Sequence, residues 1–222
     1  MSPPTRRQAG RPPLSSTAEA AQRRRILTVS TRVFARRGFH DAEVQEIADR
    51  AGMGKASIYR RWPTKTALFA ATIQNGATQL MTHIAACMDV PGEPIARLRA
   101  GARGYLEWWA GHPDLMELHI LERAEFRGAQ RKRFLLEQRD GNRRVGEVLV
   151  QLMRAGKARD LPIDRLALAL GCQLYGLVYF SSLIGDRATL GDRADELIDL
   201  FLHGLLTPAG RDIFTPADWK KP

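Results

Sequence analysis

The stretch Val44–Arg61, VQEIADRAGMGKASIYRR, decides the fold of this 222-residue chain. Apolar or small side chains recur at the i, i+3, i+4, i+7 spacing of one helical face: Val44, Ile47, Ala48 and Ala51. Gly52 and Gly54 follow, and glycine adopts the left-handed backbone that ends a helix, so they predict a sharp turn. A second helix over 55–62 would bury Ile58 and Trp62. This is the helix-turn-helix pattern, whose second helix can lie in the major groove of DNA.

The sequence on both sides of this stretch carries further characteristic strings. They are FARRGF at 34–39, VQEIADRAG at 44–52 and KASIYRRWPTKTALF at 55–69. Together they resemble the N-terminal domain of tetracycline-repressor-type (TetR family) transcription regulators over residues 23–69. The resemblance implies an all-α fold: an N-terminal three-helix helix-turn-helix DNA-binding domain, followed by a C-terminal helical ligand-binding and dimerisation domain.

The resemblance also implies which residues meet base edges. The role falls on Lys55, Ala56, Ser57 and Arg60 at the start and outer face of the second short helix. Lys55 can donate to guanine O6 or N7, and Ala56 can touch a thymine methyl group. Ser57 can donate to or accept from several bases. Tyr59 takes the position whose hydroxyl holds a phosphate.

Phosphate contacts are expected around the same helix. For Arg60 and Arg61 we favour phosphate neutralisation over base reading. Thr64 is a good N-cap for the next helix, where free backbone N–H groups and the charge of Lys65 favour a phosphate.

The start of the first helix-turn-helix helix departs from the family pattern. Ala42 and Glu43 stand where related chains place hydroxyl residues, so we expect Asp41 to cap this helix instead.

The distribution of charge supports a DNA-facing N-terminal part. The chain carries 34 Lys/Arg and 24 Asp/Glu residues, a formal charge of +10. Residues 1–75 hold 14 of the basic and 5 of the acidic residues, so they carry +9 and the remainder carries +1. A phosphate backbone attracts such a surplus. If the positive charge served only solubility, we would expect it to be spread over the whole chain.

The first residues predict a disordered basic arm over 1–19, because they are rich in Pro, Ser and Gly. Arg6, Arg7 and Arg11, in RRQAGRPP, resemble arms that enter the minor groove of DNA. The alternative is a flexible tail that attracts DNA without reading it. The helix-turn-helix domain is then expected over 20–68.

The rest of the chain reads as helices with no strand-like alternation. We expect the first helix to end at Gly38, the ligand-binding and dimerisation domain to span 69–210, and a tail to span 211–222. The expected helices are 20–37, 65–87, 95–111, 114–127, 129–155, 166–184 and 192–206, with 207–222 irregular.

Helix 166–184, LALALGCQLYGLVYFSSLI, is too apolar to face water on any side. With helix 192–206 it would form a four-helix interface with a second copy, the usual homodimer of the family, which suits DNA half-sites about 34–36 Å apart. Small residues would let these helices approach closely: Gly171, Gly176, Ser181 and Ser182. The alternative is that the helix fills the core of a monomer.

The resemblance implies a small-molecule site between the C-terminal helices. Candidate lining residues are large and mostly apolar, with a few polar tips: Tyr105, Trp108, Trp109, Met116, His119, Met153, Gln173 and Tyr179. For each, the alternative is an ordinary core residue. Because neighbours on a helix point about 100° apart, we expect that Trp108 and Trp109 do not both face one site. The ligand, if there is one, should be apolar or aromatic.

Other classes of protein fit less well. The sequence holds neither a G-x-x-x-x-G-K-S/T phosphate loop nor a G-x-S-x-G elbow, so no catalytic residues and no cofactor are expected. The five histidines are scattered, which disfavours a metal site. Cys87 and Cys172 form no C-x-x-C pair and predict free thiols.

The sequence predicts a cytoplasmic chain. No run of eighteen apolar residues occurs, so no membrane span is expected, and the N-terminus lacks the apolar core of a secretory signal.

We therefore expect a sequence-specific, homodimeric DNA-binding regulator, a repressor that a small molecule releases from a palindromic operator. The alternative is a DNA-binding dimer without ligand control, either nucleoid-type or constitutive.

Overall fold

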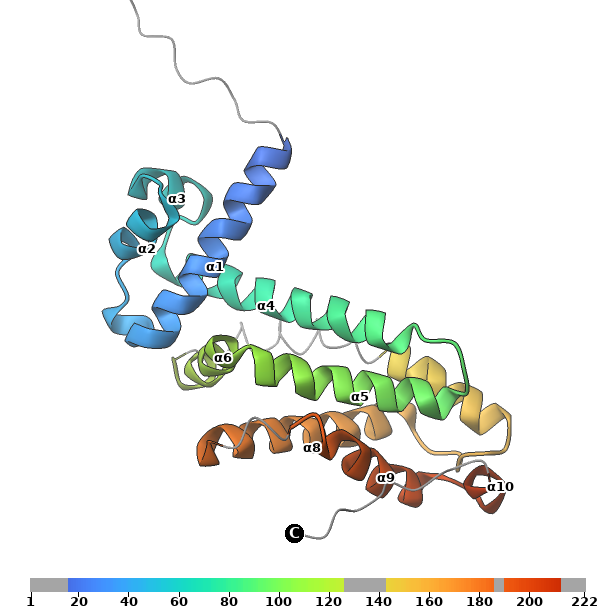
Figure 1. Cartoon of the computed structure of the whole chain (residues 1–222). Helices are drawn as coiled ribbons and strands as arrows, with labels where there is room; N and C mark the ends of the chain where they lie inside the picture. Colours follow the sequence, from blue (N-terminus) through green and yellow to red (C-terminus); the bar gives the residue numbers. More distant parts are fainter. Residues whose placement is uncertain (1–15, 126–142, 186–189, 213–222) are drawn as a thin grey trace, which may run out of the picture.

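The computed structural model describes residues 16–125, 143–185 and 190–212. In that part of the chain the elements are helical, as predicted: α1 (Ser16–Asp41), α2 (Val44–Ala51), α3 (Lys55–Arg61), α4 (Lys65–Met88), α5 (Pro94–Gly111), α6 (Pro113–Glu125), α8 (Ile163–Ile184), α9 (Arg193–Leu205) and α10 (Pro208–Arg211). Residues 143–154 are helical as well. The described residues contain no strand, only an isolated bridge between Ala158 and Leu206. The all-α prediction is confirmed (Figure 1).

Helix α1 begins earlier than predicted. Residues 16–19 are helical, so the expected arm lies outside the described residues only over 1–15. Gly38 interrupts the helix as predicted: its backbone is non-helical, with φ 76° and ψ 175°, and after this kink a short second helical segment continues to Asp41. Phe39 follows the kink, and its ring lies 5.1 Å from that of Phe69. This aromatic contact fixes the turn to the start of α4.

The turn between α2 and α3 follows the glycine prediction. Gly52 is left-handed (φ 66°, ψ 41°), and its N–H donates to the Asp49 carbonyl at 3.1 Å. Gly54 is the N-cap of α3 in an extended conformation. The expected Asp41 cap was wrong: Glu43 occupies the N-cap position of α2 and makes no side-chain cap bond. Asp41 is still part of α1, because the helix resumes after Gly38.

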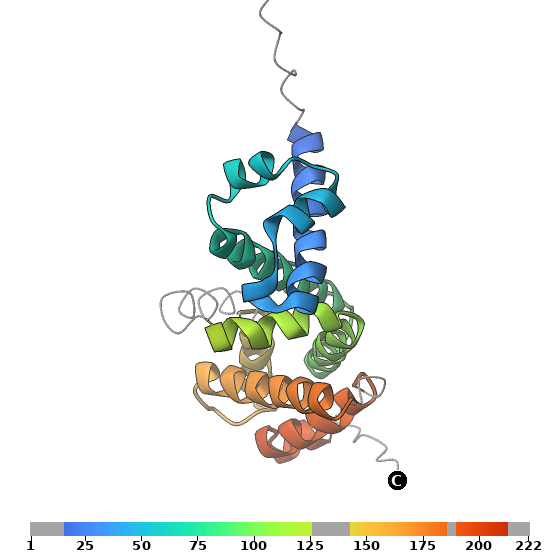
Figure 2. The ribbon, with the colours of Figure 1, turned by 90° about the vertical axis from the view of Figure 1, so that its left-hand side faces the viewer.

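The buried apolar side chains form two clusters. The first joins α1, α2, α3 and the start of α4, from Ile26 to Ile73, and includes Leu118 of α6. The second joins the rest of α4 with α5, residues 145–158, α8 and α9. Helix α4 contributes to both, and α6 lies between the helix-turn-helix and α8 (Figure 2). The expected boundary at residue 68 falls within α4, and Phe69 and Ile73 pack in the first cluster.

Helix α5 is central to the C-terminal part. It packs closely along α4 and also contacts α8 and α9. Arg99 and Arg103 of α5 both pair with Asp195 of α9. The expected helix 129–155 lies outside the described residues up to position 142.

The C-terminal end is more ordered than predicted. The short helix α10 starts at Thr207, whose hydroxyl accepts from the Gly210 N–H at 3.2 Å and donates to the Gly156 carbonyl at 2.7 Å. The expected irregular tail was therefore wrong at this point. Residues 213–222 lie outside the described part.

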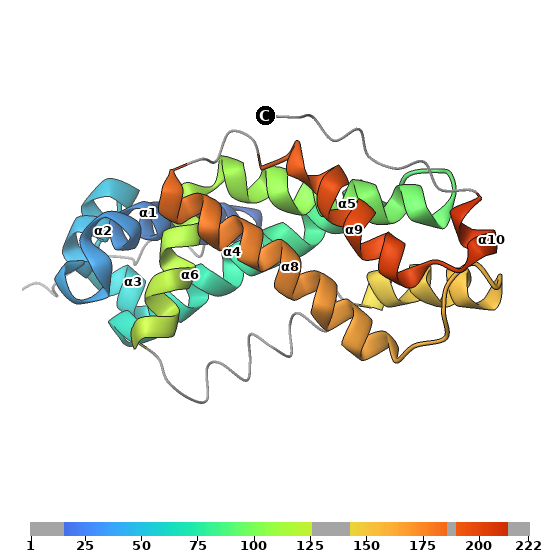
Figure 3. The same ribbon diagram turned by 90° about the horizontal axis from the view of Figure 1, so that it is seen from below.

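Helix α8 departs from the expectation about membranes. It is long and apolar enough to cross a bilayer, although one such helix is weak evidence because core helices also meet this test. Only 28% of its most apolar window is buried within the chain. Seen from below, α8 and α9 lie in front of α4 and α5 along an outer face of the molecule (Figure 3). One face of α8 therefore packs in the core of the chain, and an apolar face remains exposed.

We predict that Gly104→Val separates α4 from α5. A Cβ atom at Gly104 would lie 2.5 Å from Sγ and 3.0 Å from Cβ of Cys87, so the substitution overpacks the contact. The free energy of unfolding should fall by about 1–3 kcal/mol in denaturant titrations at fixed protein concentration. Gly111→Val is the matched control, because a Cβ there meets nothing within 4 Å. Equal effects of the two substitutions would contradict the close packing at Gly104.

Candidate nucleic-acid interface and internal cavity

Helix α3 has one buried and one solvent-facing side. Ile58 is fully buried and Trp62 nearly so, which anchors the helix in the first cluster. The outward residues are Lys55, Ala56, Tyr59 and Arg60, and Ser57 is half-buried. The Lys55 ammonium lies 6.0 Å from the centroid of the Tyr59 ring, one turn further along the helix. Arg60 makes no hydrogen bond or ion pair with any described residue, so its charge is available to a partner.

Arg61 does not share that face. Its Nη2 donates to Oε1 of Gln22 at 3.1 Å, and its Nη1 donates to the Glu19 carbonyl at 3.3 Å. Both acceptors lie near the start of α1, which comes close to the end of α3. Arg61 therefore ties the second short helix to α1.

Lys65 also points inward. Its Nζ donates to the carbonyls of His40 at 2.7 Å and of Ala42 at 3.1 Å. The same ammonium lies 5.0 Å from the centroid of the Phe39 ring. Lys65 therefore holds the α1–α2 connection, a role that the sequence did not suggest. Thr64 caps α4 as expected, because its Oγ1 accepts from the Ala67 N–H at 3.0 Å.

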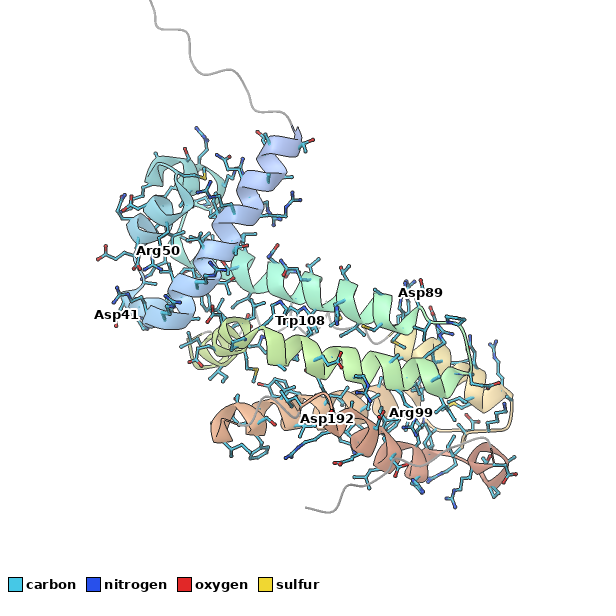
Figure 4. The ribbon with its side chains drawn as sticks, viewed as in Figure 1. Asp41, Arg50, Asp89, Arg99, Trp108 and Asp192 are labelled. Carbon is cyan, nitrogen blue, oxygen red and sulfur yellow. The ribbon has the colours of Figure 1, made fainter. Side chains whose placement is uncertain are left out.

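A partly open cavity of about 250 Å³ lies where α4, α5 and α6 meet, and Thr78 and Thr82 of its lining are exposed. Its lining comes from all three helices: Ile73, Gln74, Gly76, Ala77, Thr78, Leu80, Met81 and Thr82 of α4; Tyr105, Trp108 and Trp109 of α5; Leu115, Leu118 and His119 of α6. Figure 4 shows Trp108 between α4 and α5. None of these lining residues is a Lys, Arg, Asp or Glu.

The cavity brings together four of the expected ligand residues, namely Tyr105, Trp108, Trp109 and His119. The others lie elsewhere. Met116 is buried in the second cluster, and Met153 packs against that cluster. Gln173 is exposed on α8, and Tyr179 stacks with Tyr175 at 6.3 Å between ring centroids. Gln173 was misplaced because it occurs on the face of α8 that turns away from α5.

The expectation that only one of the adjacent tryptophans faces the site was wrong. Trp108 and Trp109 both line the cavity, with ring planes at 88° and centroids 4.9 Å apart. Two rings at right angles form two walls of one space. Trp108 also stacks on the ring of His112, at 4.2 Å, which fixes its orientation.

The contribution of α4 to the cavity was missed. None of the predicted ligand residues lies on this helix, although the run from Gly76 to Thr82 is rich in small side chains. Small residues on a helix that otherwise packs in a core leave space, and that signal could have indicated a cavity.

One buried polar group of a lining residue lacks a partner among the described residues. Trp109 is buried, and its Nε1–H has no acceptor among the described residues. His119, the other buried polar residue of the lining, has Nδ1 at 3.9 Å from Oε2 of Glu122 and its ring 5.6 Å from that of Trp109. An unpaired buried donor is unusual in a folded protein, so this N–H calls for an explanation.

A solvent-facing, basic second helix behind a glycine turn defines a helix-turn-helix protein of the DNA-binding class. Residues 26–72 match the model of the bacterial regulatory proteins of the tetR family. Over this N-terminal stretch the chain is therefore similar to that family of transcription regulators.

Two relatives and one solved structure illustrate the similarity. The transcriptional activator FasR of Mycolicibacterium smegmatis is 30% identical over 39% of this chain and 40% of its own length. The regulator RutR of Escherichia coli K12 is 26% identical over 48% of this chain and 50% of its own length. The chain thus matches half or less of these relatives. The structure of FadR from Bacillus subtilis in complex with stearoyl-CoA has a TM-score of 0.74 at 15% identity, covering 82% of this chain and 98% of that one.

We predict that Lys65→Met and Arg60→Met affect DNA binding differently. Lys65→Met removes two hydrogen bonds and should lower the free energy of unfolding by about 1 kcal/mol. It should leave unchanged the slope of the logarithm of the DNA-binding constant against the logarithm of the salt concentration. Arg60→Met should leave stability unchanged and reduce the magnitude of that slope by about 0.9, since one phosphate contact is lost. Denaturant titrations and DNA binding at several salt concentrations measure both. A flatter slope with unchanged stability for Lys65→Met would show that Lys65 contacts phosphate.

Proposed function

We propose that this chain is a cytoplasmic, homodimeric repressor that binds a palindromic operator in double-stranded DNA and is released by a small apolar or aromatic effector. The observation that carries the proposal is the outward face of α3. Lys55, Ala56, Tyr59 and Arg60 face solvent, while Ile58 and Trp62 hold the helix in the core. A short helix presented in this way fits the major groove, and the +9 charge of residues 1–75 favours its approach to DNA.

Each residue of this face has a chemical role. Lys55 and Ala56, at the start of α3, and the half-buried Ser57 would read base edges. Tyr59 is 37% exposed, and its hydroxyl would hold a phosphate. Arg60 would neutralise phosphate. Arg61, Thr64 and Lys65 would act mainly by positioning, since each makes a contact within the chain.

The uncovered face of α8 favours a second copy as its partner. Seven large apolar side chains of the described part are exposed, and five of them lie on α8 and α9: Leu168 (63%), Phe180 (65%), Leu183 (61%), Ile184 (69%) and Leu200 (62%). An apolar patch of this kind on a soluble chain marks an interaction site.

The spacing along α8 indicates how two copies would meet. Leu168, Cys172, Gly176, Phe180 and Ile184 lie four residues apart and form one ridge. Ridges of this type pack against each other with a crossing angle of about −50°. Gly176 is at the middle of the ridge, and a Cβ there would meet nothing within 4 Å in the single chain. A second α8 can therefore approach most closely at Gly176.

Helix α6 offers a route from the effector to the DNA-facing helices. Leu118 lines the cavity and is also buried in the core of the helix-turn-helix domain. Leu115 of the same helix fits against Gly76 of α4, where a Cβ would lie 2.6 Å from it. An effector that shifts α6 would therefore move both α1 and α4, and so change the spacing of the two α3 helices of a dimer.

The proposal is tested by binding the purified protein to a random duplex DNA pool at two salt concentrations and sequencing the retained DNA. A palindromic motif at the higher salt supports the dimeric regulator. Retention without a motif, which disappears as salt rises, favours the nucleoid-type form of the alternative, a DNA-binding dimer without ligand control. Transcription in vitro from the recovered motif then separates repression from activation, a distinction that matters because the relative FasR is named an activator.

We predict opposite signatures for two substitutions on α3. Lys55→Ala should relax the base preference at one operator position, by about 1–3 kcal/mol, since one base contact is lost. Tyr59→Phe should weaken binding to all sequences alike, because a phosphate contact carries no base information. Sequencing of the retained pool for each variant measures both. If neither change altered binding, α3 would not be the recognition helix.

We predict that Phe180→Glu dissociates the dimer. The charge would lie in the middle of an apolar interface, so sedimentation at micromolar concentration should show monomers with unchanged helical content. Val90→Glu is the matched control: Val90 is also exposed, at 39%, but follows α4, away from α8. A wild-type protein that is monomeric throughout this range, or a Phe180→Glu variant that stays dimeric, would contradict the interface.

The thiols give a second measurement of the same interface. Cys172 is exposed on the ridge, whereas burial, and then the negative charge of Glu107, raise the pKa of the Cys87 thiol. At pH 8 Cys87 therefore has less thiolate than a free cysteine and should react slowly with a disulfide reagent. Cys172 should react faster in Phe180→Glu than in wild type, because the dimer covers it. Equal rates in the two proteins would place Cys172 outside the interface.

A further inference from the structure

We infer that Arg25 of α1 binds a DNA phosphate beside the turn between α2 and α3, and so supplies a positive charge that α2 itself does not offer. The inference rests on the proposed function, because it assumes that α3 faces the major groove. It adds a contact from a helix outside the helix-turn-helix pair, and it is argued from the position and charge of Arg25.

The segment around α2 is acidic. Residues 41–51 hold one basic side chain, Arg50, and four acidic ones, so their formal charge is −3. In a helix-turn-helix protein the first of the two helices crosses the phosphate backbone. Here Arg50 already pairs with Glu46 of the same helix, at 2.7 Å. A phosphate near α2 therefore needs a cation from a neighbouring element.

The guanidinium of Arg25 lies at the turn that follows α2. Its Nη2 is 3.3 Å, and its Cζ 3.7 Å, from the position that a Cβ atom of Gly52 would take. Because Gly52 has no side chain, the guanidinium lies against the backbone of the turn. The same half of α1 contacts the end of α3, where Arg61 donates to Glu19 and Gln22 (Figure 1). Arg25 is therefore on the side of α1 that faces the helix-turn-helix.

The donors of Arg25 are not used within the described part of the chain. The side chain is exposed, and it makes no hydrogen bond or ion pair with a described residue. A guanidinium carries five N–H donors in a fork that fits phosphate oxygens in pairs. Arg61, in contrast, uses donors of both its Nη atoms within the chain. Arg25 is thus positioned by packing, with its donors left for a partner.

The turn limits the distance from Arg25 to the proposed base contacts. Gly52 and Lys55 are three residues apart, so their Cα atoms are separated by at most about 11 Å. The major groove is about 12 Å wide, and the phosphates of the two strands border it. When the start of α3 lies at the bases, Arg25 is therefore within reach of the phosphates at one edge of the groove.

Arg24 is a matched control at the neighbouring position of the same helix. It is also exposed, and it makes no hydrogen bond or ion pair with a described residue. Successive residues of an α-helix point about 100° apart, so Arg24 points about 160° away from Gln22, which contacts α3. Arg24 thus carries the same charge on the opposite side of α1 from α3.

The salt dependence of DNA binding tests the contact. The full chain is titrated with the operator recovered from the pool and with a duplex of random sequence, at several salt concentrations. Arg25→Met should reduce the magnitude of the slope of log binding constant against log salt by about 0.9, because one phosphate contact is lost. Between about 50 and about 200 mM salt, the variant should therefore lose about 3.5-fold less affinity than wild type. The reduction should be the same on both duplexes, since a phosphate contact carries no base information.

Two further variants separate a phosphate contact from other roles. Arg24→Met should leave the slope unchanged, and Arg25→Lys should keep the wild-type slope because it keeps the charge. Denaturant titrations should give the same free energy of unfolding for Arg25→Met and for wild type. A lower free energy of unfolding with an unchanged slope would assign Arg25 to holding the turn, and would overturn the inference.

The remaining outcomes distinguish this inference from the proposed function. Equal reductions of the slope by Arg24→Met and Arg25→Met would show an effect of general charge, which overturns the inference alone. If a motif is recovered and Arg25→Met keeps the wild-type slope, the inference fails and the proposed function stands. If no motif is recovered but Arg25→Met reduces the slope on the random duplex, the phosphate contact stands and sequence-specific regulation fails. A chain that binds neither duplex overturns both.

Discussion

The proposed recognition helix, α3, depends on contacts outside itself. Helices α2 and α3 have eight and seven residues, and isolated helices of this length are not stable in water. Their position is fixed by Ile58 and Trp62 in the core, by Arg61 on the start of α1 and by Lys65 on the α1–α2 connection. The surface proposed to face DNA is therefore only as well placed as α1 and α4, and a change in either helix would be transmitted to it.

The same dependence explains why the cavity can matter for DNA binding. Helix α4 runs without a break from the Thr64 cap, beside α3, to Met88 in the second cluster, and it supplies one wall of the cavity. Leu118 joins that wall to the core beneath the short helices. Packed cores do not deform continuously, so filling the cavity shifts whole helices rather than single side chains. The proposed effector control needs only this rigid connection.

Local signals made much of the N-terminal part predictable. The bounds of α2 and α3 followed from Gly52 and Gly54, and the break in α1 followed from Gly38, because each glycine acts on the backbone of its own segment. The helical turn after Gly38 was not predicted, and the ring of Phe39 in it packs against Phe69, thirty residues further along the chain. The inward direction of Lys65 depends on carbonyls more than twenty residues away, and no periodicity encodes such a contact.

The cavity was predictable only in part, for a related reason. Large aromatic residues on α5 indicated a possible site, but whether a side chain faces a space depends on how three helices cross. Gln173 and Tyr179 lie on α8, which contributes no residue to the cavity wall. A buried donor without an acceptor, such as Trp109 Nε1–H, can be recognised only once its surroundings are known, because no sequence pattern reports which atoms enclose an indole nitrogen.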